Sequence, residues 1–288
     1  MLLSIHHETR YDYSTPVVIS QQLMHLKPRE TERQRCLAHK LTIEPLPSEY
    51  SEGIDYFGNS VARMLAAEPH LNLTVCAESQ VRIQPPATLA RLQPAWEAVR
   101  DALRAKAADR RAVEHVFESP HVQCFPELGR YAARCFPGGC GVVDGARELM
   151  QRIHRDFAFD RSATTVATPL REVLRLRSGV CQDFAHLMIG CLRTLGLAAR
   201  YVSGYLLTDP PPGKTRLIGA DASHAWISLY LPGGDWIDLD PTNNCLVEDE
   251  HATLAWGRDF SDVTPMRGVI LGGGAQELEV KVTVAPVA

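Results

Sequence analysis

A cysteine at the start of a predicted helix is the residue of this chain whose placement most suggests chemistry. The apolar residues that follow it recur at helical spacing and end before Gly196: Phe184, Leu187, Met188, Cys191, Leu192 and Leu195. This pattern predicts a helix with Cys181 in its first turn and Ser178 as its N-cap. Unpaired N–H groups and the positive dipole end there favour a thiolate. Cys181 is a candidate nucleophile, although free cysteines are also often packed as small apolar residues.

A candidate base and a candidate carboxylate lie about forty residues downstream, in a predicted β-hairpin. Residues 224–230 and 236–240 alternate between apolar and polar side chains, and the Leu-Pro-Gly-Gly-Asp segment between them is a turn signal. The alternation places His224 on the same face as Asp238 and Asp240. An imidazole and a carboxylate on one face could act as a base and its orienting partner.

The loop length of this hairpin decides which carboxylate meets His224. If Tyr230 pairs with Gly234, the loop has three residues and Asp240 lies directly opposite His224. Directly opposed residues have Cβ atoms roughly 4.5–5.5 Å apart, which is close enough for a carboxylate to fix an imidazole tautomer. We favour Asp240, which ends the strand, and keep Asp238 as the alternative that a longer loop would select.

The polar and aromatic neighbours of these residues have less specific patterns. His186 is five residues after Cys181 and points about 140° away from it on a helix, so we expect a packed or solvent-facing histidine. We assign Gln182 and Trp226 to the substrate cleft, while packing is an equal alternative for Trp226 and is favoured for Trp236. Arginines near the helix are expected on a solvated face: Arg175, Arg177 and Arg200.

Cysteine, histidine and aspartate in this chain order, with the thiol opening a helix and the others on adjacent strands, resemble the transglutaminase-like superfamily of papain-like cysteine enzymes. The resembling stretch runs from about residue 168 to 244 and includes Ser-Gly-Val-Cys-Gln-Asp-Phe-Ala-His, His-Ala-Trp and Asp-Pro-Thr-Asn. The early segments His-Glu-Thr-Arg-Tyr-Asp-Tyr and Asp-Tyr-Phe-Gly-Asn resemble the N-terminal β-domain of bacterial members. The resemblance implies Cys181 as nucleophile, His224 as base and Asp240 as the orienting carboxylate.

The resemblance also implies an activity, which is acyl transfer or hydrolysis at a carboxamide or peptide bond through a thioester. The partner would be a peptide or protein substrate, and water or an amine would be the acceptor. It implies no cofactor and no metal. The competing interpretation is a non-catalytic module that keeps the fold and holds a peptide in its cleft.

The order of predicted elements indicates an α+β protein with two domains. Residues 1–86 contain short alternating segments separated by prolines and glycines, which is typical of a β-rich domain. Residues 87–288 are expected to form a papain-like catalytic core, with helical patterns at 95–115 and 143–157 and with C-terminal strands around 278–284.

Composition excludes several classes of protein. The chain has 288 residues, a net charge of −4 and 45% hydrophobic residues, which argues against a nucleic-acid-binding surface and for a sizeable core. It has no apolar run of about eighteen residues and no signal-peptide pattern, so we expect a cytoplasmic protein without a membrane partner. Its eight cysteines are then expected to be thiols rather than disulfides.

A zinc site is a competing interpretation for four of these residues. His121, Cys124, Cys135 and Cys140 could be drawn as four ligands, and the His-x-x-Cys half has plausible spacing. The segment has no second paired motif, and Cys124 and Cys135 stand among residues that read as packing. We therefore favour packing.

Overall fold

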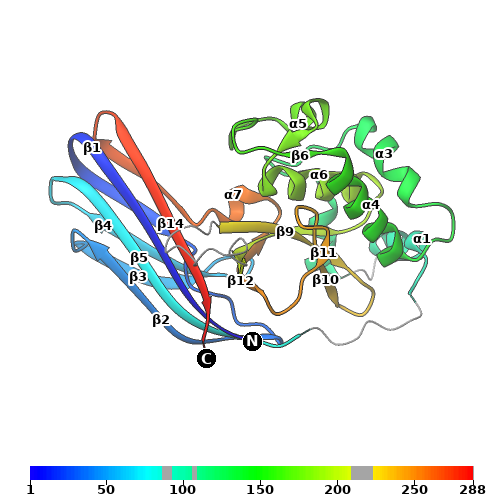
Figure 1. Cartoon of the computed structure of the whole chain (residues 1–288), viewed down its shortest axis with the longest axis horizontal. Helices are drawn as coiled ribbons and strands as arrows, with labels where there is room; N and C mark the ends of the chain where they lie inside the picture. The colour runs from blue at the N-terminus through cyan, green and yellow to red at the C-terminus, as the bar shows by residue number, and fades with distance from the viewer. Residues whose placement is uncertain (86–92, 106–108, 209–222, 288) are drawn as a thin grey trace, which may run out of the picture.

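The computed structural model describes residues 1–85, 93–105, 109–208 and 223–287 and confirms an α+β fold in two parts. An N-terminal curled sheet lies beside a part in which helices cover a smaller sheet (Figure 1). The boundary expected between residues 86 and 87 lies outside the described residues. Within the described ranges, no helix has both the length and the apolar character needed to cross a membrane.

The N-terminal sheet has seven antiparallel strands, in the order β2-β5-β1-β4-β3, with β13 and β14 also paired to β1. Long β1 pairs with β5 and β14 along its first half and with β4 and β13 along its second half. The strands are β1 (Leu2–Met24), β2 (Gln34–Glu44), β3 (Glu49–Ile54), β4 (Ser60–Ala66), β5 (His70–Ile83), β13 (Met266–Gly272) and β14 (Gln276–Pro286).

The C-terminal strands complete this first sheet, so their expected place in the catalytic core is wrong. Strand β14 runs antiparallel to β1 from the Leu3–Pro286 pair to the Tyr13–Gln276 pair. Both chain ends therefore lie at the same end of the sheet (Figure 1). The physical reason is that β1 offers two edges along its whole length. In its first half β5 covers one edge and β14 the other, and in its second half β4 covers one edge and β13 the other. The alternation of residues 278–284 predicts a strand but does not say which edge it joins.

The second part is built on an antiparallel sheet of five strands in the order β11-β10-β9-β8-β12. These strands are β8 (Ala199–Leu206), β9 (Ser223–Tyr230), β10 (Trp236–Asp240), β11 (Cys245–Leu246) and β12 (His251–Gly257). Helix α6 (Cys181–Thr194) lies against β8 and β9. The surrounding elements are α1 (Trp96–Arg104), α2 (Arg110–Val113), α3 (Pro126–Ala132), α4 (Val142–Asp156), β6 (Ala158–Phe159), α5 (Leu170–Leu176), β7 (Ser178–Gly179) and α7 (Phe260–Val263).

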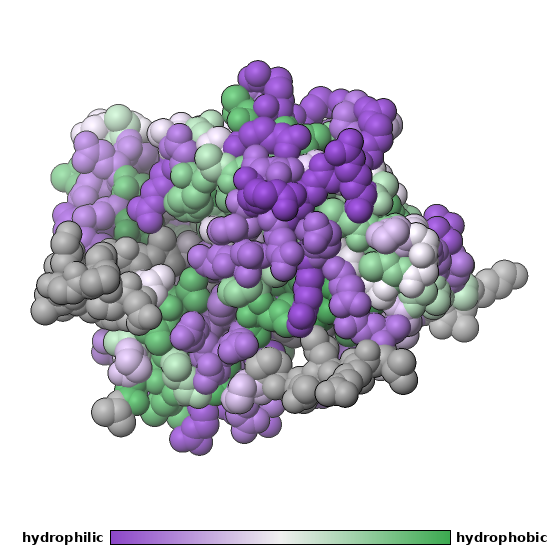
Figure 2. Space-filling model, turned by 45° about the vertical axis from the view of Figure 1, so that its right-hand side comes forward, coloured by the Kyte–Doolittle hydropathy of each residue, from purple (hydrophilic) through white to green (hydrophobic). Residues whose placement is uncertain are grey.

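Helix α6 is the central helix of this part, because its side chains are buried on every side. All residues from 183 to 193 are buried, which is the pattern of a helix enclosed by protein. The expected helix at 143–157 is confirmed as α4, which buries one face only. The face of the molecule shown in Figure 2 carries hydrophilic residues over much of its upper part, as expected for outer helices. The expected helix at 95–115 is divided into α1 and α2.

The two parts share one hydrophobic core and several hydrogen bonds. Residues of the N-terminal sheet pack in the same core cluster as α6: Leu3, Ile5, Val81, Ile83, Val282 and Val284. The Gln34 amide donates to the Thr253 carbonyl and accepts from the Thr253 N–H, both at 2.7 Å. His7 Nδ1 lies 2.7 Å from the Tyr205 hydroxyl. The N-terminal sheet is therefore joined to β8 and β12 of the second sheet.

Removal of residues 265–288 should loosen the N-terminal sheet first. Without β13 and β14, one edge of β1 loses its backbone partners, so we expect amide exchange in β1 to accelerate by more than about tenfold, or about 1.4 kcal/mol of local stability. Hydrogen exchange with mass spectrometry measures this, with β3, whose partner among the described strands is β4, as the internal control. Faster exchange in α6 with an unchanged β1 would instead assign the C-terminal strands to the catalytic core.

Candidate active site

Cys181 is the first residue of α6 and its side chain is partly exposed, as the sequence predicts. The expected N-cap is wrong, because Val180 is the N-cap and Ser178 lies in β7. Ser178 takes part in the short parallel pair with β6, which keeps the backbone extended up to Val180. The helix start is stabilised by Asp183, whose carboxylate accepts from the Val180 N–H at 2.8 Å and from the Thr164 hydroxyl at 2.6 Å.

His224 lies near the start of β9 and binds the predicted carboxylate. Its Nε2 is 2.7 Å from Asp240 Oδ2, and the thiol of Cys181 is near enough to act on its pKa. Burial works to lower the His224 pKa, but the hydrogen bonds to Asp240 and Cys181 and their charges outweigh it and raise the pKa to about 10. His224 is therefore an imidazolium at neutral pH.

The hairpin register differs from the predicted one. Tyr230 pairs with Trp236 and Ile227 pairs with Leu239, so the loop has five residues, 231–235, rather than three. Leu231 N–H donates to the Asp235 carbonyl at 2.8 Å inside this loop. Gly233 and Gly234 both have positive φ, at 103° and 96°, so Gly234 is a turn residue and is not available for pairing.

In the observed register Asp240 is still the carboxylate that binds His224, but it does so from a diagonal position rather than from the directly opposite one. Continuing the Ile227–Leu239 pairing by one residue places Asp240 opposite Trp226. Trp226 is two residues from His224 on the same face, so Asp240 reaches His224 diagonally. The longer loop also pairs Asp238 with Ser228, which moves Asp238 further from His224. The expectation that a longer loop would bring Asp238 opposite His224 is therefore wrong, because each added loop residue moves Asp238 away from His224 along the strand pair.

Asp240 is completely buried and receives hydrogen bonds from two residues that the sequence analysis missed. Asn243 donates its side-chain amide to Oδ2 at 2.7 Å, and His251 Nε2 lies 3.3 Å from the same oxygen. The N–H groups of Thr242 and Asn243 bind Oδ1 at 2.9 and 3.2 Å. Burial opposes the charge, but the hydrogen bonds from His224, His251 and Asn243 hold the pKa of Asp240 well below its usual range.

A local signal was available for Asn243 but not for His251. The Pro-Thr-Asn-Asn segment after Asp240 is suited to a turn in which an aspartate side chain accepts from backbone N–H groups two and three residues on. His251 opens β12, the strand at the far edge of the sheet from β11. No sequence spacing relates His251 to Asp240.

The residues assigned to the substrate cleft differ in position. Gln182 is half-buried in the first turn of α6, next to Cys181. Trp226 is fully buried and packs with Val202 and Val247, so the packing alternative holds for it. Its ring lies edge-on to His251, with centroids 5.3 Å apart. Trp226 therefore packs in the core beside the histidines and does not line a cleft.

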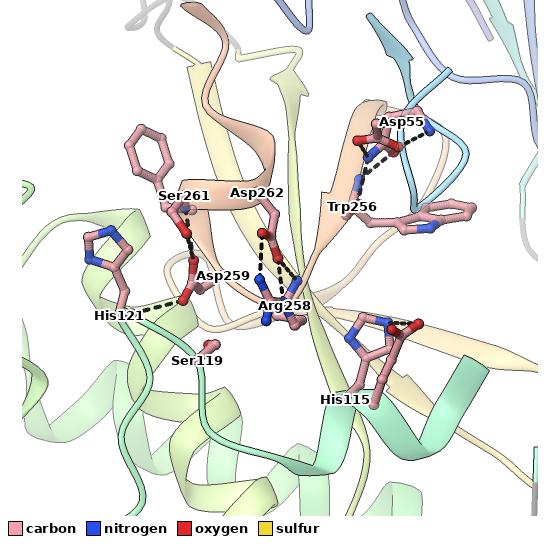
Figure 3. A network of polar contacts seen from close by, with 12 residues as sticks. Asp55, His115, Ser119, His121, Trp256, Arg258, Asp259, Ser261 and Asp262 are labelled. Carbon is pink, nitrogen blue, oxygen red and sulfur yellow. Dashed lines mark hydrogen bonds and ion pairs between the residues drawn. The ribbon is translucent and has the colours of Figure 1, made fainter. Parts of the chain in front are cut away.

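The segment after β12 is held by the polar network shown in Figure 3, where Asp259 binds His121 and Ser261 and Asp262 binds Arg258, and the C-terminal half of α6 is tied to this segment. Buried Arg193 donates to the carbonyls of Ala199 at 2.9 Å and Arg258 at 2.6 Å, and to the Ser119 hydroxyl at 3.0 Å. Asp259, which is fully buried, accepts from the backbone N–H of His121 at 2.8 Å. These bonds join α6 to the segment after β12, and they fix the helix that carries Cys181 at its other end.

His186 is a packed histidine, as expected. It is buried, its ring stacks on that of His121 with centroids 5.5 Å apart, and its Nε2 accepts from the Phe260 N–H at 3.2 Å. Burial lowers the pKa of His186 to about 3, so the ring is neutral. His186 therefore belongs to the same scaffold and not to the Cys181 site.

The zinc interpretation is not supported. Across the described ranges, the ligand atoms of a possible metal set converge only for His224, Asp240 and His251, within 4.8 Å, and not for the four residues around His121. Buried Cys135 and the ring stacking of His121 fit packing instead. The hydrogen bonds from both histidines to Asp240 account for the convergence of the first set. That the protein needs no metal stays a prediction.

Two larger cavities lie away from the thiol. One of about 1250 Å³ is lined by α1, α2 and the end of α6, and another of about 860 Å³ lies between the N-terminal sheet and β10 and β12. The second cavity is lined by Trp236, Arg200 and His251. Arg200 is half-buried there and stacks on Trp236 and Trp256, so its expected solvated face is wrong. Neither cavity is lined by Cys181 or His224.

A thiol opening a buried helix, a histidine on the adjacent sheet and a carboxylate behind it define the papain-like transglutaminase core. Comparison with family models agrees with this class. Residues 3–82 match the bacterial transglutaminase-like N-terminal region, and residues 131–241 match the transglutaminase-like superfamily. The chain therefore belongs to the transglutaminase-like superfamily, whose members are cysteine-dependent enzymes.

Similar proteins extend over most of the chain. An uncharacterized protein of Mycobacterium tuberculosis is 42% identical, over 97% of this chain and 91% of its own length. A solved structure from Cytophaga hutchinsonii, described as a candidate cysteine protease, has a TM-score of 0.77 and 22% identity, and it covers 99% of this chain and 90% of that one. A protein-glutamine gamma-glutamyltransferase of Pseudomonas aeruginosa is 35% identical over 98 residues, which are 33% of this chain and 15% of that protein.

The titration of His224 tests the electrostatics of the site. Because its folded pKa of about 10 exceeds the unfolded value of about 6.5, protonation of His224 stabilises the fold fully below pH 6.5. This stabilisation is lost as the pH rises through about 10. We expect the His224 ring signals in an NMR titration to move near pH 10, and the midpoint to fall toward 6.5 in Asp240→Asn. A wild-type midpoint near 6.5 would show that Asp240 does not hold the charge.

Proposed function

We propose that the protein is an enzyme that transfers or hydrolyses acyl groups through a thioester on Cys181. The observation that carries the proposal is the bond of His224 Nε2 to Asp240 at 2.7 Å, together with the effect of the Cys181 thiol on the pKa of His224. Nδ1 is then the ring nitrogen left for the thiol. This supports a nucleophile, a proton carrier and an orienting carboxylate acting together.

The first half of the reaction would form the thioester. The Cys181 thiolate attacks the carbonyl carbon of a carboxamide or peptide bond, and a new S–C bond forms. The oxyanion develops near the start of α6, where backbone N–H groups of the first turn have no intrahelical partner. His224 then gives its proton to the leaving nitrogen, the C–N bond breaks, and ammonia or an amine departs.

The second half would decide between a hydrolase and a transferase. Neutral His224 removes a proton from water or from an acceptor amine, which attacks the thioester and releases Cys181. Water gives a carboxylic acid, and an amine gives a new amide. The two outcomes correspond to the descriptions of the relatives, a candidate cysteine protease and a gamma-glutamyltransferase. The triad serves both, and only the acceptor site differs.

The rival proposal is a non-catalytic module that holds a peptide. Binding alone does not require a thiol, an imidazole and a carboxylate in contact. Strongly shifted pKa values, such as the lowered one of Asp240 and the raised one of His224, also cluster at functional sites. These features favour the enzyme.

Reaction profiling tests the proposed function and separates its two forms. A library rich in glutamine and in peptide bonds is incubated with the protein, with and without an added primary amine, and products are identified by mass spectrometry. Carboxylic acid products in both samples indicate a hydrolase, and amide products that appear only with the amine indicate a transferase. Neither product with wild-type protein would favour the binding module.

Replacement of two thiols on the same helix should separate chemistry from packing. Cys181→Ala should abolish turnover and leave the fold intact, because the partly exposed side chain opens the helix. Cys191→Ala should lower the stability by about 1–2 kcal/mol and keep turnover, because Cys191 is fully buried. Product formation and urea unfolding measure both effects. Loss of turnover in a well-folded Cys191→Ala variant would mean that the wrong thiol has been assigned.

The two aspartates of β10 provide a matched pair for kinetics. Asp240→Asn should lower kcat/KM by at least about tenfold, because an amide no longer stabilises the imidazolium and favours the wrong tautomer, an effect that reaches ~10⁴-fold in a serine protease. Asp238→Asn should change it less than about twofold, because Asp238 pairs with Ser228 away from His224. A larger loss in Asp238→Asn, with both variants folded, would contradict the assignment.

A further inference from the structure

A second histidine binds the carboxylate that holds His224. His251, at the start of β12, is buried, and its Nε2 lies 3.3 Å from Asp240 Oδ2. A carboxylate can only accept, so His251 Nε2 carries the proton and donates it in this bond. The other ring nitrogen of His251 is buried and has no hydrogen-bond partner in the described residues. The contact with Asp240 is therefore the polar contact that fixes this ring.

The three bonds to Oδ2 of Asp240 do not come from one segment. Asn243 is three residues from Asp240 and moves with it, since it also binds Oδ1 through its backbone. His224 is on the neighbouring strand β9. His251 comes from β12, beyond β8 in the sheet. It is thus an anchor for the carboxylate that is independent of both the turn and His224.

The position of His251 is itself fixed from two sides. On one side the Trp226 ring stands edge-on to it, with centroids 5.3 Å apart at 82°. On the other side, two residues further along β12, Gln34 of the N-terminal sheet makes both of its 2.7 Å bonds to the Thr253 backbone. The N-terminal sheet therefore holds the strand that brings His251 to the carboxylate.

We propose that His251 is a positioning residue, which holds the Asp240 carboxylate in the orientation that supports a protonated His224. His251 is not assigned a contact with the thiol and acts only through Asp240. The proposal deepens the proposed function and rests on it for any effect on turnover. Its test therefore measures the reactivity of the Cys181 thiol, which needs no substrate.

The remaining titratable groups around the site do not obscure such a measurement. Cys245, on β11 beside β10, has its pKa raised to about 11 by burial and by the charges of Asp240, Glu248 and Glu250, so it stays a thiol at neutral pH. On α6, Asp183 faces the helix start and is bound to Thr164. Labelling resolved by peptide reports Cys181 apart from these groups.

The experiment follows the rate of Cys181 alkylation by iodoacetamide from pH 5 to above pH 10, resolved by mass spectrometry, in the full chain. His251→Phe removes the donor, and we expect alkylation about tenfold slower than wild type at pH 6.5 but equal above pH 10, where His224 has lost its proton in both proteins. His251→Gln retains an N–H donor and should remain within about twofold. His115→Phe is the matched control, because His115 is also buried and lines the same cavity as His251.

A purely structural role would lower the melting temperature of His251→Phe without shifting its pH profile, and that result overturns the proposal. A shift of the profile to lower pH also overturns it, because His251 would then compete with His224 for Asp240. If His251→Phe does not fold, His251→Asn serves instead, since its shorter amide cannot reach Asp240. A wild-type Cys181 no faster than the other seven thiols at pH 6.5 would contradict the proposed function itself.

Discussion

The site depends on one buried negative charge, the carboxylate of Asp240. An ionised group without contact with water is strongly destabilising unless hydrogen bonds replace its hydration. Asp240 is fully buried, and it has five such bonds, from His224, His251, Thr242 and Asn243, the last of which donates twice. The donors therefore have to lie within hydrogen-bond distance of Asp240 for its buried charge not to destabilise the fold. The requirement constrains the turn after β10, the start of β9 and the start of β12 together.

Because of this constraint, the N-terminal sheet supports the site although it contributes no residue to the site. The sheet contributes no ligand to Asp240, but it binds β12 through Gln34 and through Asn59, whose amide donates to the Trp256 carbonyl at 2.8 Å. Arg29 in turn holds Asn59 at 2.6 Å and lies over the Trp256 ring. The Asp-Tyr-Phe-Gly-Asn segment, singled out by its resemblance to bacterial N-terminal domains, is thus part of the contact between the two sheets.

The sequence predicts those parts of the site that depend on local patterns. Periodicity places Cys181 at a helix start and His224 on a strand, because burial of one face or of all faces leaves a repeating signature. The hairpin register could not be predicted, because it depends on whether Gly234 is a strand residue or a turn residue. The sequence Leu-Pro-Gly-Gly-Asp is compatible with both. The role of His251 and the partner of the strand at 276–286 were beyond local inference, since the residues they contact are distant in sequence and no period connects them.

The raised pKa of His224 also defines what Asp240 contributes. If His224 is already an imidazolium in the resting protein, Asp240 stabilises its charge before the substrate arrives as well as during the reaction. Stabilisation that is equal in both states does not lower the barrier of the chemical step. In the proposed reaction, the carboxylate then acts mainly by keeping His224 protonated before the acyl group is transferred. Its effect on the rate of the proposed reaction is therefore confined to pH values below about 10, where His224 keeps its proton.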